Sequence, residues 1–82
     1  MFSFVQKCIT DEYNKAIKKY PDWPTDPIHA AALLGEECGE LVQACNDFYY
    51  DNGSLKNMVL EAAQAGAMVI RFLYNIKTYK RQ

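Results

Sequence analysis

The sequence has no excess of charge of one sign, no long apolar run and no cysteine spacing typical of a metal site. Nine basic residues face ten acidic ones, whereas nucleic-acid-binding domains usually carry a strong basic excess. No uncharged apolar stretch approaches the roughly 20 residues of a membrane span, and no signal peptide opens the chain. We therefore expect a cytoplasmic protein that binds no nucleic acid and no membrane.

Cysteine is also scarce. Cys8, Cys38 and Cys45 are an odd number without CxxC or Cys/His spacing. Cys38 and Cys45 lie seven residues apart on one helical face, so we expect them to be small core residues. Half of the 82 residues are hydrophobic, which predicts a packed fold. A chain this short forms a single domain over residues 1–82, and such domains usually need a metal or a partner subunit for stability.

Prolines occur only in residues 21–27, where they exclude a continuous helix. The segment before them has a capping box at Ser3 and Gln6 and ends as a helix before Pro21. Its apolar stripe repeats about every four residues and consists of Val5, Ile9, Tyr13, Ile17 and Tyr20.

Asp26 and Pro27 predict the start of a second helix that runs to about residue 50. Residues 51–54 predict a turn, in which Gly53 supplies unusual dihedral angles and Ser54 caps a third helix over residues 55–79. The expected core stripe of the second helix is Ile28, Ala31, Leu34, Cys38, Leu41, Cys45 and Phe48. The main stripe of the third is Leu55, Val59, Ala62, Gly66, Val69, Leu73 and Ile76.

The pattern therefore predicts an all-α fold of three main helices. The short link between the second and third helices predicts an antiparallel hairpin. The third helix is apolar over so broad an arc that more than one side should be covered. We expect two or more copies to form a homo-oligomer, a dimer or a tetramer, that contains a four-helix bundle.

Acidic residues cluster in the second helix without a nearby cation. Glu37 and Glu40 are three residues apart, so their like charges are neighbours on one face. Glu61 is a lone carboxylate in an apolar stretch of the third helix, and such a group is expensive to bury unpaired. In an antiparallel hairpin Glu37, Glu40, Glu61 and Gln64 lie at the same level. A hard divalent cation would relieve the repulsion, although a solvated acidic face is the simpler reading.

The string Glu37-Cys-Gly-Glu40, twenty residues, then Glu61-Ala-Ala-Gln64 resembles the ExxE…ExxD signature of the all-α nucleoside triphosphate pyrophosphohydrolases, the MazG and dimeric dUTPase superfamily. Residues 21–41 are similar to a short MazG-like subgroup. The resemblance implies Mg²⁺-dependent cleavage, with Mn²⁺ as an alternative metal, of a nucleoside triphosphate to the monophosphate and pyrophosphate, in nucleotide-pool house-cleaning. It also implies that Glu37, Glu40 and Glu61 are metal ligands.

The fourth ligand position departs from the family pattern, because Gln64 replaces the aspartate and offers a carbonyl oxygen without charge. Asp47 is either a compensating carboxylate or a helix-end acid. Glu36 is a candidate to help as the catalytic base. The candidates for substrate binding are Trp23 for base stacking, His29 for a phosphate or the base, and Arg71 and Lys77 for phosphates, each against a reading as packing or solvent-exposed residues.

Two other functions stay open at this point. The same acidic bundle could bind a nucleotide or a metal without turnover, because Gln64 lacks the charge. The chain could also be a plain helical oligomerisation module.

Overall fold

The computed structural model describes all residues from 1 to 82 and contains three α-helices and no strand. Helix α1 spans Phe2–Lys19, α2 spans Pro27–Tyr50 and α3 spans Leu55–Tyr74. The predicted all-α class and the number of helices are confirmed. None of the three helices is long and apolar enough to cross a membrane.

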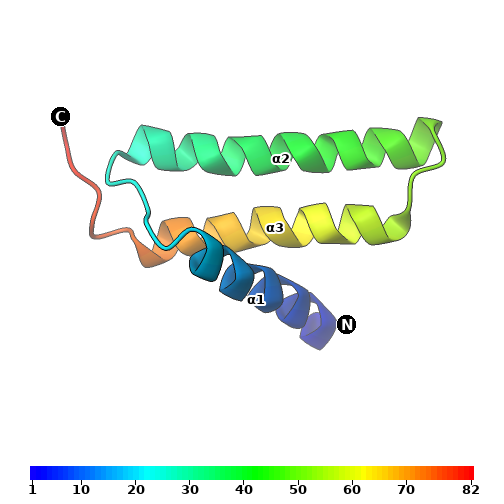
Figure 1. Cartoon of the computed structure of the whole chain (residues 1–82), viewed down its shortest axis with the longest axis horizontal. Coiled ribbons are helices and arrows are strands. Elements are labelled where there is room, and N and C mark those ends of the chain that lie inside the picture. The colour runs from blue at the N-terminus through cyan, green and yellow to red at the C-terminus, as the bar shows by residue number, and fades with distance from the viewer.

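Helix α3 lies between the other two helices. Figure 1 shows α2 and α3 side by side, with the chain reversing direction at residues 51–54, while α1 crosses α3 at an angle. Both α1 and α2 pack against α3, and their backbones do not approach each other. A space therefore remains between α1 and α2 along one side of α3.

Local sequence chemistry explains where α2 and α3 begin. The Asp26 carboxylate accepts hydrogen bonds from the backbone N–H groups of Ile28 and His29, at 2.9 and 3.4 Å. The Ser54 hydroxyl accepts one from the Asn57 N–H at 3.0 Å. Both predicted caps are confirmed, since each satisfies N–H groups that lack partners within the helix. The capping box predicted for α1 is wrong: that helix begins one residue before Ser3, and no side chain caps it.

The turn between α2 and α3 differs from the prediction in one residue. The left-handed backbone conformation belongs to Asn52, with φ of 63°, and not to Gly53. Asparagine tolerates this conformation because its side chain is short and polar. Gly53 is needed for a different reason, because an added Cβ would lie 2.9 Å from the backbone carbonyl carbon of Asp47.

Helix α3 ends at Tyr74, five residues before the predicted end. The segment that follows turns back over the proline-rich loop, where the Lys80 N–H donates to the Thr25 carbonyl at 2.9 Å. The Tyr79 hydroxyl donates to the Phe72 carbonyl at 2.9 Å and accepts from the Trp23 indole N–H at 2.8 Å. These tertiary hydrogen bonds hold the C-terminal residues against the loop instead of in a continued helix.

The buried core of one chain is small. No large side chain is fully buried, and the buried apolar residues are Ala30, Ala44, Ala63, Ala65 and Ala67. Gly66 admits α1 to close range, because an added Cβ would lie 3.0 Å from the Ile9 side chain. By contrast, an added Cβ at Gly39 would meet nothing within 4 Å.

The apolar stripes predicted as core are mostly solvent-exposed in the single chain, so that prediction is wrong at this level. In α2, Ile28 is 80% exposed and Phe48 is 43% exposed, and the expected core residues Cys38 and Cys45 are exposed as well. The inward stripe of α2 is instead shifted by about one residue and includes Ala30, Glu37 and Ala44. Several residues of the main α3 stripe are also exposed: Leu55, Val59, Val69, Leu73 and Ile76.

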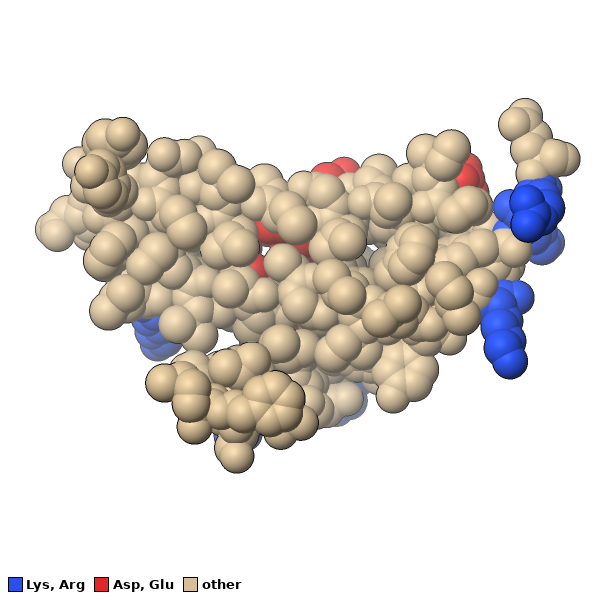
Figure 2. Space-filling view, turned by 180° about the vertical axis from the view of Figure 1, so that it is seen from behind, with Lys and Arg blue, Asp and Glu red and all other residues tan.

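These exposed residues lie together on one face. In each helix of the pair the exposed stripe is rotated by about 100° from the residues that face the other helix. Because the two helices run in opposite directions, both rotations bring the stripes to the same side. Figure 2 shows this side, which is mostly uncharged over α2 and α3 apart from a few acidic patches, one of them between the two helices. We call it the uncharged face.

Candidate metal centre and adjoining cavity

The structure brings together the side chains of Glu37, Glu40 and Glu61. One carboxylate oxygen from each residue lies within 4.8 Å of those of the other two. Glu37 and Glu40 emerge from adjacent turns of α2, and Glu61 faces them from α3. Glu37 and Glu61 are half-buried, whereas Glu40 is exposed.

Two oxygens of this cluster are buried without any hydrogen-bond partner, namely Glu37 Oε2 and Glu61 Oε2. Burial, followed by the charge of Glu40, raises the pKa of Glu37 from 4.5 to about 7. The same two causes raise the pKa of Glu61. The metal-free cluster is therefore electrostatically unfavourable, because burial and like charge both oppose ionisation.

No basic side chain relieves this repulsion. The ion pairs of the protein join Lys7 to Asp11 and Lys15 to Glu12, both within α1. Oxygen ligands of Mg²⁺ lie at 2.0–2.1 Å, so opposite ligands are about 4.2 Å apart. Adjacent ligands are only about 2.9 Å apart, and three ligands include at most one opposite pair, so oxygens that spread over up to 4.8 Å would have to draw together around a shared ion. Their donor type and their two unpartnered oxygens suit a hard divalent cation.

Gln64 lies one turn after Glu61 on α3, but its side chain forms a hydrogen bond with α1. Its side-chain amide donates a hydrogen bond to the Glu12 carboxylate at 3.3 Å. Asp47 is not part of the carboxylate cluster. It accepts a hydrogen bond from Gln43 at 2.8 Å, and its backbone carbonyl accepts from Asp51 and Gly53, as a residue at a helix end does.

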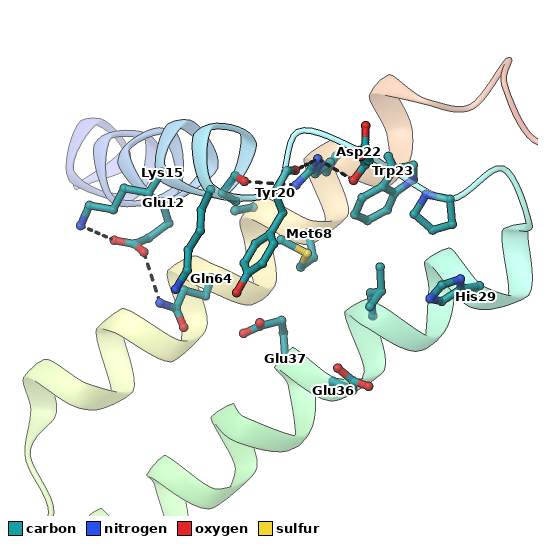
Figure 3. Close-up of a pocket in the computed structure, with 16 residues that line it drawn as sticks. Glu12, Lys15, Tyr20, Asp22, Trp23, His29, Glu36, Glu37, Gln64 and Met68 are labelled. Atoms are coloured by element: carbon teal, nitrogen blue, oxygen red, sulfur yellow. Dashed lines mark hydrogen bonds and ion pairs between the residues drawn. The ribbon is translucent and has the colours of Figure 1, made fainter.

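A cavity of about 880 Å³ adjoins the cluster and fills the space between α1 and α2. Glu37 lines it and so connects the carboxylates to the cavity. Figure 3 shows Glu12, Lys15 and Gln64 at one end, and Trp23 and His29 toward the other. Between Gln64 and Arg71 α3 rises about 10 Å, which gives the cavity an elongated shape.

Six predicted site residues line this cavity: Glu37, Gln64 and Arg71, and also Trp23, His29 and Glu36. Trp23 is half-buried and is held by its hydrogen bond to Tyr79. His29 and Glu36 are exposed at the α2 wall. Glu36 is close enough to Glu37 to contribute to the raised pKa of that carboxyl.

Arg71 and Lys77 differ in their burial and in their position relative to the cavity. Arg71 lines the cavity but is only 4% exposed, so the alternative reading of Arg71 as a solvent-exposed residue is wrong. Its guanidinium donates to the backbone carbonyls of Ala16, Tyr20 and Asp22, and it lies over the Trp23 ring at 4.9 Å. Arg71 therefore fastens the end of α1 and the proline-rich loop to α3. Lys77 is exposed beyond the end of α3 and does not line the cavity.

Sequence reasoning missed the polar residues that α1 contributes to the cavity, namely Glu12, Lys15 and Lys19. Their spacing of three and four residues places them on one helical face. That spacing is visible in the sequence, but the helix was interpreted from its apolar stripe alone, and its polar face was not considered.

Comparison of the chain with known protein families, with curated proteins and with solved structures finds no match.

Proposed function

We propose that this protein is a Mg²⁺-dependent nucleoside triphosphate pyrophosphohydrolase, which converts the substrate to the nucleoside monophosphate and pyrophosphate. One observation carries the proposal: three carboxylates from two helices converge, with two buried oxygens unpartnered, at the wall of a cavity of about 880 Å³. The cavity volume is within the range of small-molecule sites. The resemblance of the two acidic motifs to the MazG-like signature supports the same reaction.

In this proposal Glu37, Glu40 and Glu61 hold the divalent cation, with Mn²⁺ as a substitute. The cation, when bound, offsets phosphate charge and polarises a water molecule. At the fourth ligand position of the family Gln64 brings no charge, and its amide N–H donates to Glu12.

Glu36 lies one residue from Glu37 on the cavity wall and is the candidate proton acceptor. Water adds to a phosphorus atom of the anhydride between the α- and β-phosphates and gives its proton to the Glu36 carboxylate. The phosphorus–oxygen bond of the anhydride breaks, and the two products are the nucleoside monophosphate and pyrophosphate. The cavity between α1 and α2 holds the substrate during this step.

The test is incubation with Mg²⁺ and a panel of ordinary and modified triphosphates, with pyrophosphate release as the readout. We expect release that disappears when Mg²⁺ is chelated and in the Glu40→Gln variant. A matched control is Asp47→Asn, which changes an acid of the same helix outside the cluster. Absence of release with every triphosphate would contradict catalysis.

A second candidate is a nucleotide- or metal-binding protein without turnover. The observation that favours it is Gln64, which is uncharged and donates its amide N–H to Glu12, so that the cluster has only three charged ligands. A rise in melting temperature with Mg²⁺ and triphosphate, but without pyrophosphate release, would favour this candidate. If neither pyrophosphate release nor a rise in melting temperature is observed, the remaining candidate is a helical oligomerisation module.

The proposal includes a homo-oligomer, a dimer or tetramer, in which the α2–α3 hairpins of two copies form a four-helix bundle. It rests on the uncharged face, where Leu55 is 63% and Leu73 is 60% exposed while the core of one chain contains no large buried side chain. Contiguous exposed apolar surface is typical of protein interfaces. Two such faces packed together would give each chain the core that it lacks alone.

A further inference from the structure

Helix α1 presents two lysines to the cavity that neither the sequence motifs nor the acidic cluster involves. Lys15 and Lys19 lie four residues apart, on one face of α1, and both line the cavity. Lys18, the residue directly before Lys19, is exposed and does not line it. Lys15 and Lys19 therefore bring positive charge to this wall because of their positions on the helix, and not only because the segment is rich in lysine.

Lys15 is held in place by a chain of contacts that reaches α3. Its ammonium lies 3.1 Å from the Glu12 carboxylate, and that carboxylate also accepts the hydrogen bond from Gln64 at 3.3 Å. The Glu12 side chain is 12% exposed, compared with 74% for Lys15. Glu12 is thus an anchored acceptor that holds the Lys15 ammonium at one end of the cavity; in Figure 3 this ammonium lies on the side of Glu12 that is turned away from Glu37.

Arg71 adds a third positive charge to the same side of the cavity. Its guanidinium is bonded only to backbone carbonyls, and no carboxylate forms an ion pair with it. A buried cation without a countercharge favours an anion nearby, since little solvent screens it. The wall formed by α1, the loop after it and the adjacent part of α3 carries three cations, Lys15, Lys19 and Arg71, and two acids, Glu12 and Asp22, whereas Glu36 and Glu37 make the α2 wall acidic.

We infer that Lys15 and Lys19 bind the phosphate chain of the substrate, an inference that rests on the proposed function. A cation held by the acidic cluster would neutralise the negative charge of the α2 wall, and a phosphate chain along α1 would neutralise the positive charge of the opposite wall. Lysine is a common phosphate ligand because its ammonium is a compact charge on a flexible stem. The phosphate chain lies at the end of the cavity formed by Glu12 and Gln64, next to the carboxylates. Arg71 attracts it through its positive charge without contacting it.

The test is calorimetric titration of the full-length protein with an α,β-methylene nucleoside triphosphate, which resists hydrolysis at this bond, in the presence of Mg²⁺. We expect Lys15→Ala and Lys19→Ala each to weaken binding about tenfold, the loss typical of one charge-assisted hydrogen bond. Lys18→Ala is the matched control and keeps the affinity of the original protein. Lys15→Arg and Lys19→Arg restore most of the loss, and circular dichroism shows unchanged helix content in all variants.

Two further readouts separate this inference from the proposed function. Mg²⁺ titrated alone binds equally well to the original protein and to both lysine variants, because the lysines act on phosphate and not on the cluster. Higher ionic strength weakens triphosphate binding more in the original protein than in the variant that carries both Lys15→Ala and Lys19→Ala, because salt screens the lysine charges. The inference is overturned if the two alanine variants bind like the Lys18→Ala control, or if all three lose affinity equally. If the original protein binds no triphosphate, the proposed function fails as well.

Discussion

Replacing Glu37 with glutamine should stabilise the metal-free protein, although this residue belongs to the candidate site. Burial and the charge of Glu40 raise the pKa of this carboxyl from 4.5 to about 7, so its ionised form is unfavourable in the folded chain. Glutamine keeps the shape of the side chain and removes the charge.

The size of the effect follows from the pKa. A rise from 4.5 to about 7 corresponds to about 3 kcal/mol at most when the group is fully ionised. Because Glu37 is half-buried and partly screened by solvent, we expect about 1–2 kcal/mol. For a domain of this length that is a rise of about 5–10 °C in melting temperature.

The sign depends on pH. Well below pH 4.5 the carboxyl is protonated in both the folded and the unfolded chain, and the glutamine variant has no advantage. As pH rises from 4.5 to about 7, the unfolded chain releases its proton first, so the stability of the original protein falls. Above that range the penalty, and hence the advantage of glutamine, is complete.

The assay is thermal unfolding of both proteins, at equal concentration and in the presence of a chelator, at about pH 4 and at about pH 8. The advantage of Glu37→Gln should appear only at the higher pH, and excess Mg²⁺ should reverse the order of the two proteins. A Glu36→Gln control changes a neighbouring exposed acid and should have a much smaller effect. If Glu37→Gln is less stable than the original protein at both pH values, the electrostatic reasoning is wrong.

Three further predictions concern the same site and its supports. Mg²⁺ affinity measured by calorimetry should weaken up to about tenfold per unit as pH falls below about 7, because protons compete for Glu37, and a flat profile would contradict this. Arg71→Ala should lower the free energy of unfolding by about 2–4 kcal/mol in urea titrations, since it leaves buried carbonyls unpaired; Arg71→Lys should restore little of it. Val69→Glu on the uncharged face should dissociate the oligomer in light-scattering measurements, whereas Lys56→Glu outside the apolar stripe should leave its mass unchanged.

The starts of α2 and α3 were predictable from neighbouring residues, whereas the capping box at Ser3 and Gln6 was not found. Asp26 and Ser54 begin helices because each side chain bonds N–H groups two or three residues ahead. The end of α3 was not predictable in this way, because the contacts of Tyr79 with Trp23 and Phe72 join distant parts of the chain. Such tertiary contacts override local helix preference.

The inward face of α2 shows a related limit of apolar periodicity. The stripe through Ile28 and Cys38 is more hydrophobic than the face that packs on α3, which includes Glu37. A charged residue at an inward position lowers the apolar signal of the buried face, so the outer face was chosen. The motif spacing still brought Glu37 and Glu61 together, because that inference rests on helix register and not on hydrophobicity.

Arg71 was as visible in the sequence as Glu61, since both are single charges in an apolar helix. Its partners are backbone carbonyls of α1 and the loop, which leave no mark in the side-chain pattern. Its burial could therefore not be predicted. The lysines on α1 were visible by spacing, but only the arrangement of α1 beside α2 turns them toward a shared cavity.

The most direct test of the metal centre is electron paramagnetic resonance of Mn²⁺ bound to the protein near pH 8. The account predicts that the original protein binds Mn²⁺, that Mg²⁺ displaces it, and that Glu61→Gln on α3 weakens binding as strongly as Glu40→Gln on α2. Unchanged Mn²⁺ binding in Glu61→Gln would show that the two helices do not share a cation, and would contradict the account.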